Sequence, residues 1–443
     1  MPSSNNRAAF TRTLWWFGCA VLWSAIAGAA TGAAVDVRTG ATDLVRCVRA
    51  AAVVDDLAPL VALSAEARVL ALGEPAHGAH EPLALRNRLF EHLIEHGNFT
   101  AVALETGFTE SRELHDVIAS GNRNADLREL TRKSLSWGFG EYEENVELLQ
   151  WLVAYNADPS HRRKVQFYGI DISGADNQDG FSNAPGAIEA ALQSLAIAKP
   201  ALAVRFRTEL AGLLPYFTDT HYSKLSIAQQ EELRHILASI SNALRPNDPS
   251  AWAAHDIVMA QRLQTMFSVR SPRDSNTAML PDDYRLVNVR DAAMAENVQW
   301  VLRREGPKGK VLVFAHNAHV MNAGSRGGIW SVFAEVPGMM GQRLRAALGR
   351  KLIVVGTLAG TTDTDLPQPA ALDTSLEAVL VQLGEPRVFL DLRRAACDRE
   401  AAVWLRQLRP IHANFDTWLD VELSSAFDAV ELIARLSQAH HGD

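Results

Sequence analysis

One pattern recurs along this chain: a short apolar run ends in an acidic residue or a histidine, and a helix-like segment follows. In its fullest copy, residues 69–72 are apolar, Gly73 and Glu74 follow, and leucines at helical spacing begin after Pro82. Short apolar runs bounded by glycine and proline indicate buried strands, and apolar residues three or four apart indicate amphipathic helices. The pattern therefore predicts strand–loop–helix units, which assemble into a mainly parallel sheet covered by helices.

Other apolar runs fit the same pattern. Residues 101–104 end in Glu105, residues 164–170 end in Asp171, and residues 310–315 end in His316. Further strands are expected to complete the sheet at residues 352–355, 388–390 and 418–421. Helices are expected over residues 43–63, 83–96, 141–156, 283–304 and 339–348. We therefore expect an α/β fold with a three-layer α/β/α core, a mainly parallel sheet and an inserted α-helical lid.

The middle of the chain differs in character from both ends. Residues 184–266 carry long helical stretches and no convincing strand. We expect residues 184–272 to form a helical insertion, a lid packed over the carboxyl edge of the sheet. Residues 36–183 and 273–443 are then expected to form the α/β catalytic core.

The first residues resemble a targeting signal. A polar start with Arg7 and Arg12 precedes an apolar run at 14–27 and small residues at 27–29. This order predicts a secretory signal peptide over residues 1–29 and a secreted or periplasmic protein without stable membrane insertion after its removal. A single membrane anchor is the alternative, although the apolar run is shorter than the ~20 residues that span a bilayer.

Charge and cysteine content limit the partners and cross-links. The net charge of −8 and the lack of a basic cluster exclude nucleic acid as a partner, so we expect a small-molecule substrate. Once the signal is removed, the remaining thiols are Cys47 and Cys397. A disulfide between them and two unpaired cysteines are both open. The oligomeric state is not predicted.

Several acids and imidazoles follow strand ends and are expected to converge at one edge of the sheet. They are Glu74, His77, Glu105, His316 and His319. One interpretation is ester hydrolysis by water, with a histidine as general base and a second histidine or Arg86 stabilising charge on the attacked carbonyl. The sequence has no Gly-x-Ser-x-Gly motif and no cysteine near these residues, so a covalent nucleophile is lacking.

A second interpretation is that the same side chains hold a ligand. His316-x-x-His319 is compatible with two ligands of a zinc-like metal on a turn, although it is not the helical His-Glu-x-x-His pattern. The alternatives are therefore a metal-dependent hydrolase or a module that binds a metal or a haem-like ligand without turnover.

At these residues the sequence resembles the erythromycin esterase family. The resemblance covers residues 69–356 and is carried by several blocks in order: Gly73-Glu74-x-x-His77-Gly78, Glu81, Arg86, Glu105, Arg290-Asp291-x-x-Met294-Ala295-x-Asn297, His316-Asn317-x-His319 and Met340-Gly341-x-x-Leu344. It implies a three-layer α/β core with a helical insertion. It also implies, for antibiotic-inactivating members, hydrolysis of a macrolide lactone by histidine-activated water without an obligatory metal.

Carried over by position, the resemblance makes His77 the general base with Glu74 beside it. Arg86, Glu105, His316 and His319 resemble the remaining catalytic positions. Substrate contacts are expected from His80, Glu81, Asp171, Asn317 and Arg290. For some of these residues structural roles stay open: Asn317 as a turn residue, Arg290 in an ion pair with Asp291, and Arg86 as a partner of Glu81 or Glu105.

Two positions depart from the family pattern. Ala76 replaces a small hydroxyl residue before the base, and His80 replaces a small residue. The lost hydroxyl bears on how water is positioned. We expect a secreted hydrolase of an ester or lactone, with macrolides among the candidate substrates and with no metal or cofactor at its catalytic site.

Overall fold

The computed structural model describes the chain from residue 56 to residue 442 with short gaps, together with three earlier residues. The described residues are 44–45, 47, 56–175, 181, 183–244, 251–270, 279–362, 372–394, 399–414 and 417–442. The expected signal peptide at 1–29 lies outside them. Within the described part of the chain, no helix is both long and apolar enough to cross a membrane.

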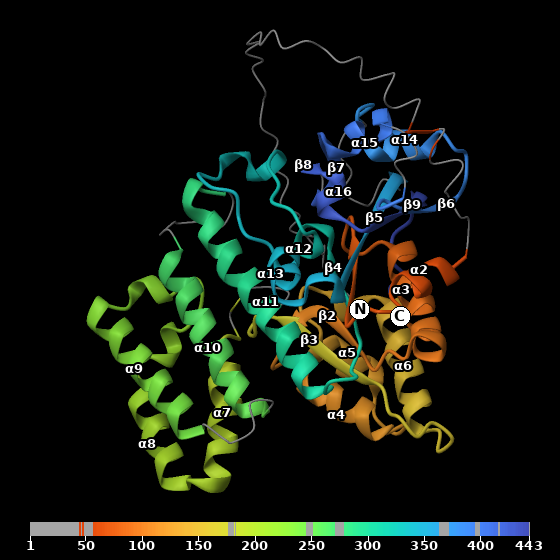
Figure 1. The fold of residues 1–443 in the computed structure, drawn as a ribbon. Helices are drawn as coiled ribbons and strands as arrows, with labels where there is room; N and C mark the ends of the chain where they lie inside the picture. Colours follow the sequence, from red (N-terminus) through yellow and green to blue (C-terminus); the bar gives the residue numbers. More distant parts are fainter. Residues whose placement is uncertain are drawn as a thin grey trace, which may run out of the picture.

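A seven-stranded sheet forms the centre of the molecule, in the order β3-β2-β4-β1-β5-β9-β6 (Figure 1). Its strands are β1 (Val69–Glu74), β2 (Ala101–Gly107), β3 (Gln166–Asp171), β4 (Val311–His316), β5 (Leu352–Thr362), β6 (Arg387–Asp391) and β9 (Ala429–Leu436). All neighbouring strands are parallel except β6 and β9. Successive residues of β1 alternate between two cores: Leu70 and Leu72 face one, and Val69 and Ala71 face the other. Such burial on both faces is typical of parallel sheets.

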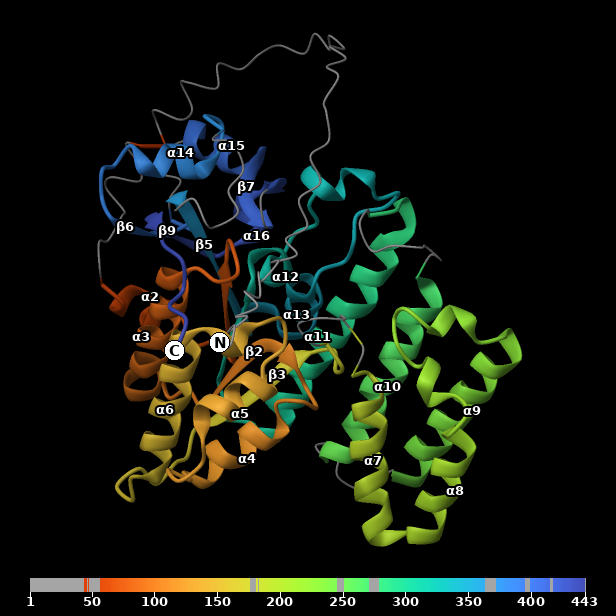
Figure 2. The same cartoon turned by 180° about the vertical axis from the view of Figure 1, so that it is seen from behind.

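Helices cover both faces of the sheet, as the two opposite views show (Figures 1 and 2). One layer contains α2 (Ala58–Leu63), α3 (His80–Gly97), α4 (Arg112–Ser120), α5 (Leu127–Ser134) and α6 (Glu143–Ala157). The other contains α11 (Tyr284–Arg304), α12 (Asn317–Val320) and α13 (Met340–Leu348). The expected three-layer α/β/α class is therefore confirmed.

The segment expected as an insertion is helical throughout its described residues. It contains α7 (Pro185–Ala198), α8 (Pro200–Leu210), α9 (Ile227–Leu244) and α10 (Trp252–Val269). These helices pack on one another and, through α10, on α11 (Figure 2). Their role as a lid stays a prediction.

The remaining elements lie toward the C-terminus or are short. They are α14 (Leu376–Val381), α15 (Arg399–Arg406), α16 (Leu423–Ala426), β7 (Leu408–Asn414) and β8 (Thr417–Glu422). Short 3₁₀ helices occur at Phe139–Glu141, Leu214–Tyr216, Tyr222–Lys224, Pro281–Asp283, Gly328–Val332 and Gly349–Lys351.

The structure corrects several expectations about elements. The strand expected at 418–421 exists as β8, but it pairs with β7 in a separate two-stranded sheet. The seventh strand of the main sheet is instead β9, which the sequence did not predict. Residues 317–320, expected as a loop, form the one-turn helix α12. Of the helix expected at 43–63, α2 is observed at 58–63, and most of 43–55 lies outside the described residues.

Cys47 forms a disulfide. This excludes the alternative in which Cys47 is an unpaired thiol. The other cysteines of the chain, Cys19 and Cys397, lie outside the described residues.

Candidate active site

Four neighbouring strands each bring a candidate side chain to the same edge of the sheet. In spatial order these are Asp171 at the end of β3, Glu105 near the end of β2, His316 at the end of β4 and Glu74 at the end of β1. All four are buried. The expectation that Glu74 and Glu105 share an edge is therefore confirmed, with β4 between their strands. In open α/β sheets, this carboxyl edge is where ligands bind.

His77 lies in the loop after β1 and is held by a carboxylate. Its Nδ1 is 2.6 Å from Oε1 of Glu74. Its ring packs against His316 at 4.9 Å and Phe139 at 5.0 Å between centroids. Burial alone would lower the pKa of His77, but the hydrogen bond and the charge of Glu74 outweigh it, so the pKa is raised. A raised pKa makes the imidazole a stronger base for taking a proton.

His316 differs in protonation from its neighbour. Burial and the nearby His77 hold the pKa of His316 well below its usual value, so its imidazole is neutral. Its backbone N–H donates to Oε2 of Glu105 at 2.8 Å. The site therefore places a neutral histidine beside a more basic one, which is a common arrangement for acid–base chemistry.

Arg290 links two of the strand-end acids. Its Nε and Nη2 donate to the two carboxylate oxygens of Asp171 at 3.0 and 2.7 Å, and Nη2 also donates to Glu105 at 2.8 Å. Arg290 thus pairs with Asp171 and not with its sequence neighbour Asp291, which corrects one expected alternative. Because bidentate arginine–carboxylate pairs fix geometry, Arg290 and Asp171 hold Glu105 in place.

His319 lies at the end of α12 between two acids. Its Nδ1 is 3.0 Å from Asp291, and its Nε2 is 3.3 Å from Glu105. Burial lowers the pKa of His319, but Asp291 and Glu105 together raise it to about 10. Because both ring nitrogens of His319 are then protonated, its Nε2 and Nη1 of Arg290, which lie 3.3 Å apart, are both hydrogen-bond donors. This approach is therefore a contact and not a hydrogen bond.

A cavity borders both glutamates of the site. Glu74, Glu105, Arg86, Tyr142 and Phe139 are among its lining residues. Burial lowers the pKa of Arg86 to about 10, so its guanidinium stays charged at neutral pH. Burial and nearby acids raise the pKa of Tyr142 to about 12, so its phenol stays protonated. The cavity thus offers a cation and a hydroxyl donor beside two carboxylates.

Arg86 does not pair with Glu81 or Glu105, which were its expected structural partners. Its guanidinium donates to Asn145 at 2.8 Å and to the side chain of Asn87 at 2.7 Å, and lies over the ring of Phe314. These contacts fix one face of the guanidinium from α3 and α6.

Other expected substrate contacts lie apart from the histidines. Both carboxylate oxygens of Glu81 accept hydrogen bonds from Ser437, and His80 contacts Glu144. Asn317 exchanges hydrogen bonds with the backbone of Thr357, which holds α12 against β5. These contacts tie elements together, and a role of these residues in binding substrate stays a prediction.

Sequence reasoning missed three residues of the site. Phe139 belongs to a Trp-Gly-Phe-Gly turn and Tyr142 follows it, and this turn carries no chemical signal of its own. Asp291 stood beside Arg290 in the sequence, but its contact with His319 depends on how α11 and α12 pack. The one signal that could have indicated Asp291 is that a buried histidine such as His319 commonly has an acidic partner.

A metal ion fits poorly among these histidines. Among the residues that the structure describes, the group whose three ligand atoms lie close enough for one ion is His80, Glu144 and His440. His77, His316 and His319 are not part of it, because each is engaged with a carboxylate or a neighbouring ring.

The fold and the site define an α/β protein with a histidine–carboxylate cluster at the carboxyl edge of a parallel sheet, a class equipped for acid–base chemistry. Residues 94–435 match the erythromycin esterase family, and the chain belongs to that family. The resemblance identified from the sequence is therefore confirmed.

Similar proteins agree with this assignment. Erythromycin esterase type II of Escherichia coli is 26% identical over 86% of this chain and 93% of its own. A Bacillus cereus crystal structure superposes with a TM-score of 0.72 at 22% identity, covering 91% of this chain and 99% of its own. A mutant of the erythromycin esterase EreC in its open conformation gives 0.65 at 20% identity, over 86% and 94%. The family and its relatives support a hydrolase of the ester or lactone type.

Proposed function

We propose that this protein hydrolyses a carboxylic ester or lactone with a water molecule activated by His77. One observation carries the proposal: Glu74 holds His77, whose pKa is raised, beside the neutral His316. Glu105 lies at the same edge of the sheet. Water activation needs a base that is oriented and basic enough to take a proton, and Glu74 both orients His77 and raises its pKa.

In the proposed reaction, the Nδ1–H of neutral His77 donates a hydrogen bond to ionised Glu74, so the lone pair of the imidazole lies on Nε2. Nε2 takes a proton from water as the water oxygen bonds to the carbonyl carbon. The imidazolium that forms is stabilised by the charges of Glu74 and Glu105. When the bond from carbon to the alkoxy oxygen breaks, the same proton passes to the leaving oxygen, and the products are an acid and an alcohol.

The developing negative charge on the carbonyl oxygen would be stabilised from the cavity. Arg86 has five N–H groups, and its hydrogen bonds to Asn87, Asn145 and the Glu144 carbonyl use four of them. The fifth N–H and the hydroxyl of Tyr142 are candidates for an oxyanion site, because both groups line the cavity in their donor forms.

A covalent route lacks support. The residues lining the cavity include no serine, threonine or cysteine within the described part of the chain. Direct attack by water is therefore the simplest route, since it needs a base and an oxyanion site only.

The substrate class is proposed from the family. The similarity to erythromycin esterase type II of Escherichia coli supports a macrolide lactone as one candidate. The cavity that Glu74, Glu105 and Arg86 line would receive the reacting ester group.

The test is a screen of macrolides and smaller lactones by mass spectrometry for the gain of one water, with an activated ester as a second substrate. We expect hydrolysis that survives chelator treatment and falls about 10²- to 10⁴-fold in His77→Ala. His92→Ala, on the outer face of α3, is the matched control and should retain full activity. Activity that returns only on adding a divalent ion would favour the metal-dependent hydrolase, and binding without turnover would favour the binding module.

We also propose that the protein is exported and loses residues 1–29. The signal-like N-terminus supports this, and so does the disulfide of Cys47, because disulfides persist in oxidising compartments. N-terminal sequencing of protein from the periplasm or the medium should find a mature chain that starts near residue 30. Intact chain recovered from the cytoplasm alone would contradict export.

A further inference from the structure

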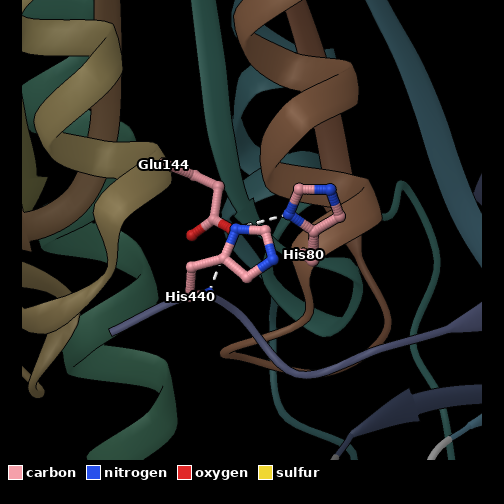
Figure 3. A group of neighbouring side chains, drawn as sticks. All are labelled: His80, Glu144 and His440. Carbon is pink, nitrogen blue, oxygen red and sulfur yellow. Dashed lines mark hydrogen bonds and ion pairs between the residues drawn. The ribbon is translucent and has the colours of Figure 1, made fainter. Parts of the chain in front are cut away.

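A second cluster of histidines and an acid lies beside the loop that carries His77, and hydrolysis makes no use of it. His80 begins α3, Glu144 lies in the first turn of α6, and His440 belongs to the C-terminal tail (Figure 3). Nδ1 of His80 is 2.6 Å and Nδ1 of His440 is 3.2 Å from the same oxygen of Glu144. Within the described residues, these ligand atoms all lie within 4.8 Å of one another.

The donor types are those of a zinc site. Two imidazole nitrogens and a carboxylate are a common protein ligand set for Zn²⁺, with bonds of about 2.0–2.2 Å and a fourth position for water. In the structure, Oε1 of Glu144 accepts hydrogen bonds from Nδ1 of His80 at 2.6 Å and from the backbone N–H of His440 at 3.1 Å, and Nδ1 of His440 lies 3.2 Å from the same oxygen. An ion would replace the shared protons and move the three side chains apart by a fraction of an ångström.

Glu144 gives independent evidence for a missing cation. Its side chain is 1% exposed, and its second oxygen, Oε2, is buried without a hydrogen-bond partner. A buried carboxylate oxygen left in this state is costly, because no hydrogen bond replaces its lost hydration. The guanidinium of Arg86 donates to the backbone carbonyl of Glu144 and not to Oε2. A divalent ion bound to the carboxylate would compensate for its burial.

The cluster is open to ions on its other side. The side chains of His80 and His440 are 31% and 67% exposed. A hydrated ion could therefore reach the carboxylate and keep a water ligand on the solvent side. The site thus combines a buried anionic anchor with two accessible imidazoles.

The three ligands join segments that are far apart in the sequence. The tail is already paired with the loop, since Ala439 N–H donates to Gly78 O at 2.8 Å, and with α6, since Glu143 N–H donates to His440 O at 2.7 Å. His77 immediately precedes Gly78. A metal at this point would fasten the tail across the loop that positions His77.

We propose that His80, Glu144 and His440 bind a zinc-like divalent ion that fastens the C-terminal tail to the His77 loop. This site is distinct from the alternative of a catalytic metal, which would use His316 and His319. Its role is structural, because its ligands bridge the tail, α3 and α6 and do not border the cavity.

The test is calorimetric titration of Zn²⁺ into chelator-treated, full-length protein that carries no histidine tag. We expect one ion per chain, and binding weakened by about 100-fold or more in His440→Ala, because the loss of a direct ligand should exceed the effect of losing an outer partner. His440 is exposed on the tail, so this substitution leaves the core intact. His92→Ala removes a histidine from the exposed His92–His96 pair of α3 and should bind as the unchanged protein does.

A second measurement separates this site from binding elsewhere. Zinc should raise the midpoint of thermal unfolding in the unchanged protein and in His92→Ala but not in His440→Ala, since only binding to the folded site shifts the equilibrium. The proposal is overturned if the unchanged protein binds no zinc at millimolar concentration. It is equally overturned if His440→Ala binds with unchanged affinity, or if His92→Ala loses the site.

Discussion

Glu105 is the acid of the candidate site that contacts two positively charged side chains, Arg290 and His319. It contacts Arg290 and His319 with one oxygen and the backbone N–H of His316 with the other. Burial would raise the pKa of Glu105, but His319 and Arg290 together hold it well below its usual value. The carboxylate is therefore ionised across the neutral range, and it contributes a fixed negative charge beside the two remaining histidines.

Glu74→Gln should separate orientation from basicity at His77. Glu74 raises the pKa of His77, so its neutralisation lowers that pKa and moves the acidic limb of the kcat/KM profile to lower pH. The rate at the plateau should also fall, because a neutral amide stabilises the imidazolium less well. The measurement is the pH dependence of ester hydrolysis. Glu95→Gln, exposed on α3, is the control, and an acidic limb that stays in place in Glu74→Gln would argue against this pairing.

His319→Asn should change how stability depends on pH. The folded pKa of His319, about 10, lies above its unfolded value of 6.5. Protonation therefore stabilises the folded state fully below pH 6.5, and this contribution is lost as pH rises toward 10. Loss of a buried partner costs about 3–5 kcal/mol, toward the lower figure here because Arg290 still contacts Glu105.

The measurement is urea unfolding of both proteins from pH 6 to pH 10. The difference in unfolding free energy should be largest near pH 6 and should shrink as pH rises. A difference that is constant over this range would show that His319 is not protonated in the folded state.

At the scale of elements, the packing of α12 on β1 determines where His316 and His319 lie. Gly73 permits this packing: a Cβ there would lie 2.2 Å from Oδ1 of Asn317 and 2.7 Å from Val320. The helical turn can therefore rest directly on the strand. Asn317 then holds the turn from the other side through Thr357 of β5.

Gly73→Ala should push α12 away from the sheet. Overpacking of this kind costs about 1–3 kcal/mol, and the displaced histidines should lower the hydrolytic rate as well. Gly212→Ala is the matched control, because a Cβ there meets no atom within 4 Å. Urea unfolding and ester hydrolysis of both variants are the measurements. Equal stability of the two variants would contradict the close packing.

The sequence predicted the elements that carry a local signal. Strands β1, β2 and β4 begin as continuous apolar runs, and β3 is largely apolar although it begins with Gln166. Each has a polar residue at or near its carboxyl end, so both the strands and the shared edge follow from their pattern. Strand β9 was missed because its apolar run contains Glu431, whose charge is compensated by Arg387 on β6. That partner is distant in the sequence, so the local pattern gives no sign of it.

At the scale of the whole molecule, the sheet order determines which predicted residues meet. Strand β4 lies between β1 and β2, although more than two hundred residues separate it from both along the chain. This order brings His316 between Glu74 and Glu105. His80 and Glu81 sit near His77 in the sequence, but the C-terminal tail and α6 engage them instead. Proximity in the sequence carries no information on such distant partners, so it could not predict these contacts of His80 and Glu81.

The disulfide of Cys47 should contribute to the stability of the whole molecule. Cys47 is 1% exposed and packs in the core on the α11 side of the sheet. A disulfide restricts the unfolded chain and typically adds about 2–4 kcal/mol to the free energy of unfolding. Reductant should therefore lower the urea midpoint of the unchanged protein. Cys47→Ser should start from a lower midpoint and show no further change with reductant. If reductant does not change the urea midpoint of the unchanged protein, the disulfide does not stabilise it, and Cys47 is held in the core by burial alone.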